Sequence, residues 1–224
     1  VLACQEPLKR LLQGVAGISE TVALDGPVPA FEHHAALASL AHILDVNPEK
    51  LPPAKAYVGS SEAPWQFEAP AAARLKIGFA WSGSPANKIN RRRSCPVDFL
   101  TPLFGRDDIA CYSLQVGPGS EGISGNGQIE DLSPRLKDFA DTAAAIAGLD
   151  LVITIDSAVA HLAGALGHPV WVMLSHSGDW RYLRGREDNP WYPTMRHFRQ
   201  PEPGDWAAVV SAVQDALDGF GPSA

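Results

Sequence analysis

The sequence predicts an α/β fold with a parallel sheet, and three observations support this. Residues 151–155 and 170–174 are continuous apolar runs without polar alternation. Residues 158–166 between them are small and helix-favouring, and a Gly-His-Pro sequence ends that helix. Strands that are apolar on both faces are typical of parallel sheets covered by helices on both sides. Strand-like and helix-like segments also alternate along the chain, which favours a doubly wound arrangement.

From residue 76 onward this alternation is regular. We expect strands at residues 76–81, 110–115, 151–155, 170–174 and 196–199. We expect helices at residues 97–104, 139–147, 158–166 and 206–217. Between them lie two long loops, a basic one at residues 82–94 and one rich in Gly and Ser at residues 117–127. These residues form the C-terminal domain, which we place at 71–224.

Residues 1–70 are interpreted as a partial N-terminal α/β domain. Short strands at residues 1–3 and 21–24 enclose a helix at residues 6–13, and a loop followed by a helix is expected at residues 31–44. Five prolines then follow between residues 48 and 70, so this stretch is extended. Because the sequence opens with Val1 in a strand, without an initiator Met, we expect a piece of a longer protein.

Composition argues against several classes of protein. The 224 residues carry a net charge of −7, which argues against a general nucleic-acid surface. Cys4, Cys95 and Cys111 have neither CxxC nor His-rich spacing, so no disulfide framework or metal site is indicated. A reducing cytoplasm is the expected location. No apolar run has the length of a membrane span, and there is no signal peptide.

Polar residues gather where the strand at residues 151–155 ends and its helix begins. Asp156, Ser157 and His161 occupy this junction. Ligands bind at the carboxyl edge of open α/β sheets, and free N–H groups at a helix start attract anions such as phosphate. Asp156 can instead be the N-cap of the helix, and His161 can be a packed core histidine. We favour ligand-facing roles for both.

The loop after the strand at residues 76–81 begins Ser82-Gly83-Ser84-Pro85. Small residues let a ligand approach the backbone, and both serine hydroxyls can donate to phosphate oxygens. Lys88 and the run Arg91, Arg92 and Arg93 follow and can neutralise a diphosphate. Taken alone, this loop is better explained as a solvated turn, but together with the second phosphate-like site at Ser157 a ligand-binding role is the better explanation. Neither the GxGxxG nor the P-loop pattern is present.

Further candidates lie at the same edge. Asp138 and Asp141 open the helix at residues 139–147, where carboxylates favour the dipole and can also meet ligand hydroxyls. Gln115 ends the second strand and can bond a nucleobase or ribose. The aromatic segments 179–182 and 190–193 are either a lid or a packed corner, with no preference between the two.

These motifs resemble the C-terminal half of the bacterial heptosyltransferase-like glycosyltransferases (glycosyltransferase family 9), in particular the branch found behind tetratricopeptide repeats. The shared elements include W-x-G, D-F-x-D-T-A-A, a strand-helix unit containing D-[ST]-x-x-A-H-L-A-G-A-L-G, and D-W-R-[WY]-L. These four motifs stand here at residues 81–83, 138–144, 150–171 and 179–183, and three further ones stand at 93–94 (R-S), 113–115 (S-L-Q) and 189–200 ([SN]-P-W-Y-P-x-M-R-x-F-R-Q). In residues 1–70 the resemblance is weaker.

The resemblance implies a GT-B architecture: a Rossmann-like C-terminal domain plus an incomplete N-terminal α/β domain facing it across a cleft. It also implies a nucleotide-diphosphate sugar, ADP- or UDP-linked, as co-substrate, and no other cofactor. The donor-binding residues it implies, together with those argued above, are Ser82, Gly83, Ser84, Lys88, Arg93, Gln115, Asp141, Asp156, Ser157, Ala158 and His161.

The catalytic base is sought in the N-terminal part of the protein. Glu32 and His34 are the nearest acid/base candidates within the chain, although an ordinary turn is the favoured interpretation there. The resemblance implies a catalytic carboxylate in the part of the N-terminal domain that precedes Val1. We therefore also expect that the base can lie upstream of Val1.

The expected function is metal-independent, inverting transfer of a sugar to an acceptor hydroxyl. The acceptor is a glycan, a lipid-linked sugar or a protein, and upstream tetratricopeptide repeats are expected. No DxD pair sits in a suitable loop, so no metal is implied. The alternative is a catalytically inactive module that binds a nucleotide sugar or a partner protein. A nucleotide-sugar epimerase of the same fold is a third possibility, which the motifs disfavour.

Overall fold

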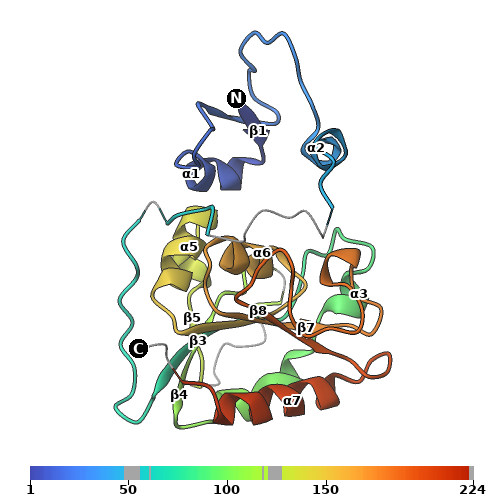
Figure 1. Ribbon diagram of the computed structural model, residues 1–224. Helices are drawn as coiled ribbons and strands as arrows, with labels where there is room; N and C mark the ends of the chain where they lie inside the picture. The colour runs from blue at the N-terminus through green and yellow to red at the C-terminus, as the bar shows by residue number, and fades with distance from the viewer. Residues whose placement is uncertain (48–55, 61, 118, 121–127, 222–224) are drawn as a thin grey trace.

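The protein is described by a computed structural model that covers residues 1–47, 56–60, 62–117, 119–120 and 128–221. Its centre is a six-stranded sheet in the order β5-β4-β3-β6-β7-β8, and every neighbouring pair is parallel. Helices cover both faces of this sheet, as Figure 1 shows. The α/β fold with a parallel sheet is therefore confirmed.

The strands are β1 (Leu2–Cys4), β2 (Thr21–Ala23), β3 (Leu75–Ala80), β4 (Ile109–Ser113), β5 (Glu130–Asp131), β6 (Leu151–Ile155), β7 (Val170–Leu174) and β8 (Met195–Arg199). The α-helices are α1 (Lys9–Leu12), α2 (Leu37–Ile43), α3 (Asn90–Arg93), α4 (Thr101–Phe104), α5 (Phe139–Ala147), α6 (Ala158–Ala165) and α7 (Trp206–Asp218). Short 3₁₀ helices are η1 (Glu6–Leu8), η3 (Val97–Leu100), η4 (Ser133–Arg135) and η5 (Trp180–Tyr182).

The apolar strands are buried on both sides, which explains their lack of polar alternation. In β7, Val170, Val172 and Leu174 belong to one core cluster, and Trp171 and Met173 belong to the other. The first cluster includes the alanine-rich faces of α5 and α6, while the second includes α4 and α7. Side chains alternate across a strand, so each face of the sheet has its own apolar layer.

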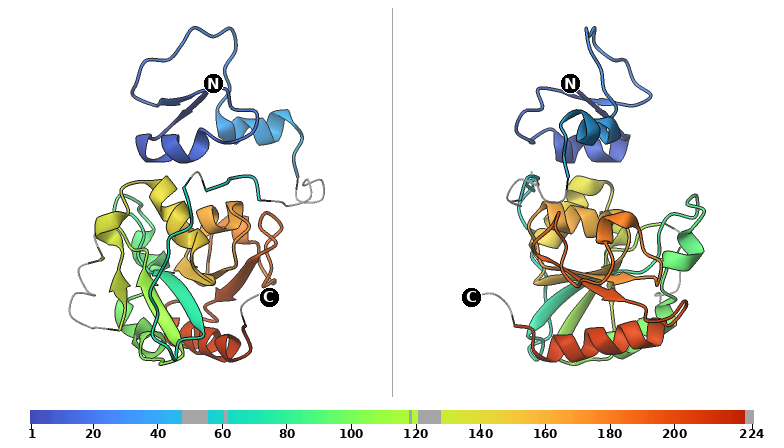
Figure 2. Two further views of the ribbon diagram at one scale, coloured as in Figure 1. Left: turned by 90° about the vertical axis from the view of Figure 1, so that its left-hand side faces the viewer. Right: turned by 45° about the vertical axis from the view of Figure 1, so that its right-hand side comes forward.

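The N-terminal residues form a small separate layer. Strands β1 and β2 pair in parallel as a two-stranded sheet, and α1 packs beside them against α5 (Figure 2). The guanidinium of Arg10 in α1 donates to both carboxylate oxygens of Asp138, at 2.8 and 2.7 Å. Helix α2 contains no buried residue. The domain boundary after residue 70 stays a prediction. Residues 65–68 already pack against the C-terminal part of the chain, where the Trp65 N–H donates to the carbonyl of Ala144 in α5.

The structure corrects several expected elements. The first strand begins at Leu2, so Val1 lies outside it. The basic loop contains the single-turn helix α3, and a two-residue strand β5 extends the sheet beyond β4. The helix expected at residues 97–104 is a 3₁₀ turn followed by one α-turn. Most of the loop expected at residues 117–127 lies outside the described residues. Within the described part of the chain, no helix combines the length and apolar character of a membrane span.

Gly148, at the end of α5, tests the packing of the 65–68 segment. A Cβ at this position would overlap the backbone carbonyl oxygen of Trp65 and lie 3.0 Å from Phe67. We expect Gly148→Ala to lower the free energy of unfolding by about 1–3 kcal/mol, because backbone must shift. Gly105→Ala is the control, since Gly105 also ends a helix and its nearest atoms lie at 3.6 Å. Equal urea midpoints for the two variants would contradict this packing.

His168, in the turn between α6 and β7, makes stability depend on pH. Its Nε2 has no hydrogen-bond partner among the described residues, and burial lowers the pKa of the ring to about 4. The unfolded chain binds a proton as pH falls through about 6.5, whereas the folded ring does not. Stability should therefore fall by about 1.4 kcal/mol per pH unit between pH 6.5 and 4 through this group.

Urea unfolding of the protein and of His168→Gln at pH 7.5 and 4.5 measures this contribution. The substitution should flatten the acid loss, while His33→Gln, at an exposed site, should leave it unchanged. Parallel acid losses in all three proteins would show that His168 is not the source.

Candidate functional site

A cavity of about 480 Å³ opens at the carboxyl edge of the sheet, beside the ends of three strands. Residues just after β3, β4 and β6 form much of its wall, and the start of α5 closes one side. The lining residues are Pro7, Ala80, Ser82, Gly83, Ser84, Pro85, Arg93, Leu114, Gln115, Val116, Leu136, Lys137, Asp138, Phe139, Thr142, Ser157, Ala158 and Val159. We call this the edge cavity.

The start of α6 faces the edge cavity with free amides. Ser157 is the N-cap residue, but its Oγ lies 3.0 Å from Thr154 Oγ1 and makes no bond to the helix amides. Ser157, Ala158 and Val159 all line the edge cavity. The unpaired N–H groups and the helix dipole together give this wall a positive electrostatic character.

Asp156 does not cap α6, and so that interpretation is wrong. Its side chain is buried, accepts a hydrogen bond from Tyr182 Oη at 3.0 Å and lies 3.8 Å from Arg93 Nη1. Asp156 is also absent from the cavity wall. It holds two groups near the site rather than meeting a ligand directly.

Arg93 is the most prominent cation of the edge cavity. Its side chain is 14% exposed, and its Nε has no hydrogen-bond partner among the described residues. A Cβ on Gly83 would come within 2.7 Å of Arg93 Nη2, so the missing side chain leaves room for the guanidinium. Arg93 is therefore a partly desolvated cation whose pairing with Asp156 is loose, which suits an anionic ligand.

Gln115 holds the loop after β3. Its Oε1 accepts from the backbone amides of Trp81 at 3.1 Å and Ser82 at 2.8 Å, and its Nε2 donates to Val116. Ser94 Oγ accepts from Gly83 N–H on the other side. These bonds fix the backbone of residues 81–83 against the cavity, and the amide of Gln115 is largely used in doing so.

His161 lies away from the cavity wall. Its ring packs between Tyr182 and Tyr192, with centroids at 6.0 and 5.8 Å, and its Nδ1 lies 3.3 Å from Tyr192 Oη. Burial lowers the pKa of the ring, and the nearby Arg181 adds to this. The interpretation as a packed histidine fits this environment. Trp180 and Trp191 contact edge to face, and Trp180 is 70% exposed, so the alternatives of a lid and a packed corner for these segments both stay predictions.

Asp138 rather than Asp141 lines the cavity. Asp138 caps α5 by accepting from the amides of Ala140 and Asp141, and Arg10 bonds both of its oxygens. These bonds to Arg10 hold the pKa of Asp138 below its ordinary value. Asp141 also accepts from Arg10 and from the Lys137 amide. Lys137, which sequence reasoning missed, lines the cavity directly before the N-cap.

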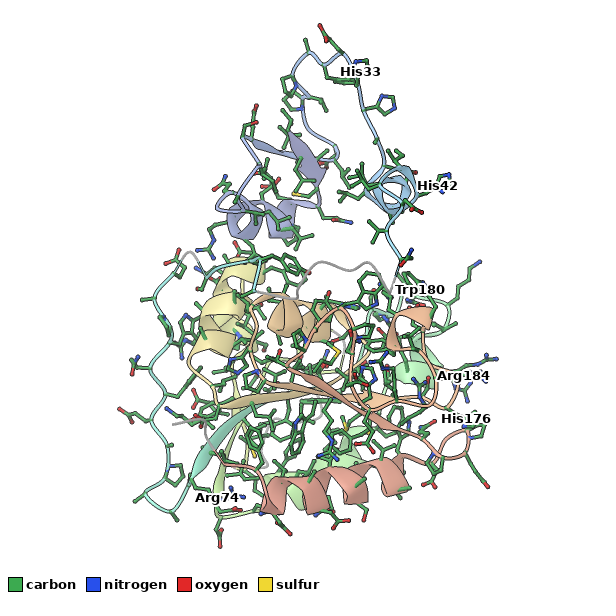
Figure 3. The ribbon with its side chains drawn as sticks, viewed as in Figure 1. His33, His42, Arg74, His176, Trp180 and Arg184 are labelled. Carbon is green, nitrogen blue, oxygen red and sulfur yellow. The ribbon has the colours of Figure 1, made fainter. Side chains whose placement is uncertain are left out.

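Besides Asp141, Asp156 and His161, three further predicted residues are not brought to the cavity. Lys88 is exposed and outside its wall. Glu32 and His34 are exposed in the loop before α2. Their neighbour His33 is labelled in Figure 3 at the far tip of the N-terminal layer, away from the sheet. A catalytic role for Glu32 or His34 at this cavity is therefore not supported.

Val1 does not border the site either. It is 65% exposed in the N-terminal layer and is absent from the wall of the edge cavity. A catalytic base upstream of Val1 stays a prediction. No cluster of His, Cys, Asp or Glu within the described ranges could hold a metal ion.

The Tyr182–Asp156 bond tests how this region is held together. Tyr182 is fully buried, and burial is the main reason why its pKa is raised, so that its hydroxyl stays a donor. Tyr182→Phe should lower the free energy of unfolding by about 1–3 kcal/mol, because it removes a donor from a buried carboxylate. Tyr57→Phe, at an exposed hydroxyl, should change it by less than about 0.5 kcal/mol. Urea denaturation measures both, and equal effects would contradict a stabilising role for this bond.

Comparisons with known proteins agree with the sequence motifs. Residues 123–176 match glycosyltransferase family 9 (heptosyltransferase). Protein FlbA of Caulobacter vibrioides is 33% identical over 155 residues, which cover 66% of this chain and 26% of that protein. The chain thus spans about a quarter of the length of this curated relative.

Two solved structures are similar in outline. The family 9 glycosyl transferase of Veillonella parvula aligns with a TM-score of 0.46 at 15% identity, over 71% of this chain and 54% of that chain. The ADP-heptose lps heptosyltransferase II of E. coli aligns with a TM-score of 0.46 at 16% identity, over 91% and 58% of the two chains.

Proposed function

From the match of residues 123–176 to glycosyltransferase family 9 (heptosyltransferase), we propose that the chain is the donor-binding part of a glycosyltransferase. The donor is a nucleotide-diphosphate sugar, ADP- or UDP-linked, held in the edge cavity. Transfer to the acceptor hydroxyl is metal-independent and inverting. The cytoplasmic location stays a prediction from the cysteine pattern, and the upstream tetratricopeptide repeats stay a prediction from the resemblance.

The observation that carries this proposal is the convergence of anion-binding groups on one cavity. The uncapped start of α6, the hydroxyls of Ser82 and Ser84, and the cation of Arg93 all border the same space. Amides at a helix start and a partly desolvated guanidinium are suited to a pyrophosphate. They also stabilise the negative charge that develops on a departing nucleotide diphosphate.

The two helix starts beside the cavity differ in a way that orients the donor. The amides at the start of α5 are capped by Asp138, whereas those of α6 have no side-chain cap. A phosphate is therefore favoured at α6 and disfavoured beside the Asp138 carboxylate. Leu114, Leu136 and Phe139 line the cavity and offer apolar surface to the nucleoside.

The chemistry assigned to this chain is stabilisation of the leaving group rather than activation of the acceptor. A general base must take a proton from the acceptor hydroxyl. Asp138 is the one carboxylate in the edge cavity's wall as described, and its oxygens are already bound by Arg10 and backbone amides. Its lowered pKa makes it a poor base. We therefore propose no base among the residues described in the wall of the edge cavity.

The lack of a suitable base in the described wall of the edge cavity also supports a second candidate function, a module that binds a nucleotide sugar without transferring it. Donor binding by this chain is common to both functions. Sugar transfer by the longer parent protein would eliminate the second candidate, and donor binding without transfer or hydrolysis by that protein would favour it.

Calorimetry with ADP- and UDP-linked sugars tests the donor site. Arg93→Gln should weaken binding by about 10- to 100-fold, because it removes a charge-assisted contact worth about 1.5–3 kcal/mol. Arg184→Gln is the matched control, since Arg184 is an exposed arginine outside the cavity wall. It should change the affinity less than about twofold.

Two results would count against the donor site. One is the absence of binding by any of these sugars to a folded protein. The other is an equal loss in the Arg93 and Arg184 variants, which would point to net charge rather than to a built site.

A further inference from the structure

A second cavity, of about 680 Å³, lies farther along the carboxyl edge of the sheet. Its polar wall consists of Arg91, Arg92, Ser175, His176, Ser177 and Gln200. Ser175 follows the end of β7 and Gln200 follows the end of β8, so this cavity is next to the edge cavity in strand order. Figure 3 labels His176 at this side of the molecule. We call it the β7–β8 cavity.

The arginines of this cavity are not neutralised by acidic side chains of the described residues. Arg91 and Arg92 are exposed, and neither forms an ion pair with a carboxylate of the residues that the structure describes. Arg93, on the same helical turn, instead borders the edge cavity. The short helix α3 therefore supplies cations to two neighbouring cavities, one on each side.

Gln200 supplies a buried polar group that the fold does not satisfy. It is 3% exposed, and its Oε1 accepts from the backbone amides of His176 at 3.2 Å and Gly204 at 3.1 Å. Two N–H donors fix the orientation of the amide, because only the oxygen can accept from both. Its Nε2 then has no hydrogen-bond partner among the described residues. A buried donor without an acceptor is costly, and it belongs here to a residue of the cavity wall.

The rest of the described wall combines hydrogen-bond donors with apolar surface and adds no carboxylate. Ser175 and Ser177 add hydroxyl donors, and Trp206 with Pro203 adds an apolar floor. Glu202 is exposed on the same turn but is not part of the wall. Asp205 is engaged as the cap of α7 through Ala208 N–H.

From these observations we infer that the β7–β8 cavity is a second binding site, for a small molecule that carries a phosphate or carboxylate oxyanion. Its guanidinium, hydroxyl and amide donors all match oxygen acceptors. Its volume exceeds that of a bare phosphate and admits a sugar-sized body attached to the anion. This site is separate from the donor site and does not require donor binding.

Nitrogen-15 NMR titrations of the folded protein with inorganic phosphate and with glucuronate test the site. The amides of His176 and Gly204 report on it, while those of Ser157 and Ala158 report on the edge cavity. We expect saturable shifts at His176 and Gly204 with at least one of the probes. A response to phosphate alone or to glucuronate alone identifies which oxyanion the site prefers.

Arg92→Gln should weaken this binding by about tenfold, and Arg184→Gln, an exposed arginine outside the wall, should change it less than about twofold. Gln200→Glu keeps an oxygen for the two backbone amides but replaces the unpartnered Nε2 with a charged oxygen. It should abolish the shifts while the thermal melt shows a folded protein.

Three results would overturn the inference. These are the absence of saturable shifts at His176 and Gly204, an equal loss in the Arg92 and Arg184 variants, and unchanged binding in a folded Gln200→Glu protein. Loss of nucleotide-sugar binding in Arg93→Gln leaves these readouts intact, so the two sites can fail independently.

Discussion

The parallel pairing of β3 with β4 and β6 is the constraint on which both cavities depend. Parallel strands end at the same edge, so residues 82–85, 114–116 and 157–159 meet although they are far apart in sequence. Parallel pairing in turn requires strands buried on both faces, which the apolar runs supply. The register of β7 and β8 extends the same edge and creates the second cavity.

Local chemistry then decides which groups at that edge are available. Two helices begin beside the edge cavity, and only α5 has a side-chain cap. Arg10 neutralises Asp138 and contacts Asp141, so the acidic cluster at α5 is committed to joining the N-terminal layer to the sheet. The free amides of α6 and the loosely paired Arg93 are what remains for an anion.

The sequence predicted the strand–helix–strand unit closely, because its signals are local. Strands β6 and β7 have the expected bounds, and α6 ends one residue before the expected end. An apolar run and a Gly-His-Pro stop depend little on the rest of the chain. Helix α3 was missed because its residues, Asn-Arg-Arg-Arg, have no apolar periodicity. Two hydrogen bonds across the loop hold it instead: Gly83 N–H donates to Ser94 Oγ, and Cys95 N–H donates to the carbonyl of Trp81.

The candidate site was predicted less evenly, for a physical reason. The sequence motifs and, for Ala158, the family resemblance predicted one shared edge for a set of residues that all line the cavity: Ser82, Gly83, Ser84, Arg93, Gln115, Ser157 and Ala158. It could not tell which side chains turn inward. Lys88 points to solvent, and His161 packs between two tyrosines that are distant in sequence. Whether Asp138 is available to a ligand depends on its hydrogen bonds with Arg10. These two residues are 128 positions apart, so no local sequence pattern predicts their contact.

Asp156 shows how a buried acid can serve a site that it does not line. An isolated carboxylate at this depth would be costly, and the hydroxyl of Tyr182 supplies one direct hydrogen bond. Arg93 lies 3.8 Å away, too far for a tight ion pair but near enough for attraction. Asp156 thereby draws the guanidinium toward the start of α6 without consuming its donors. A shorter, bidentate pair would have held Arg93 equally well but left it fewer bonds for a ligand. The loose geometry therefore fits a positioning residue, one that acts through Arg93 and does not line the cavity itself.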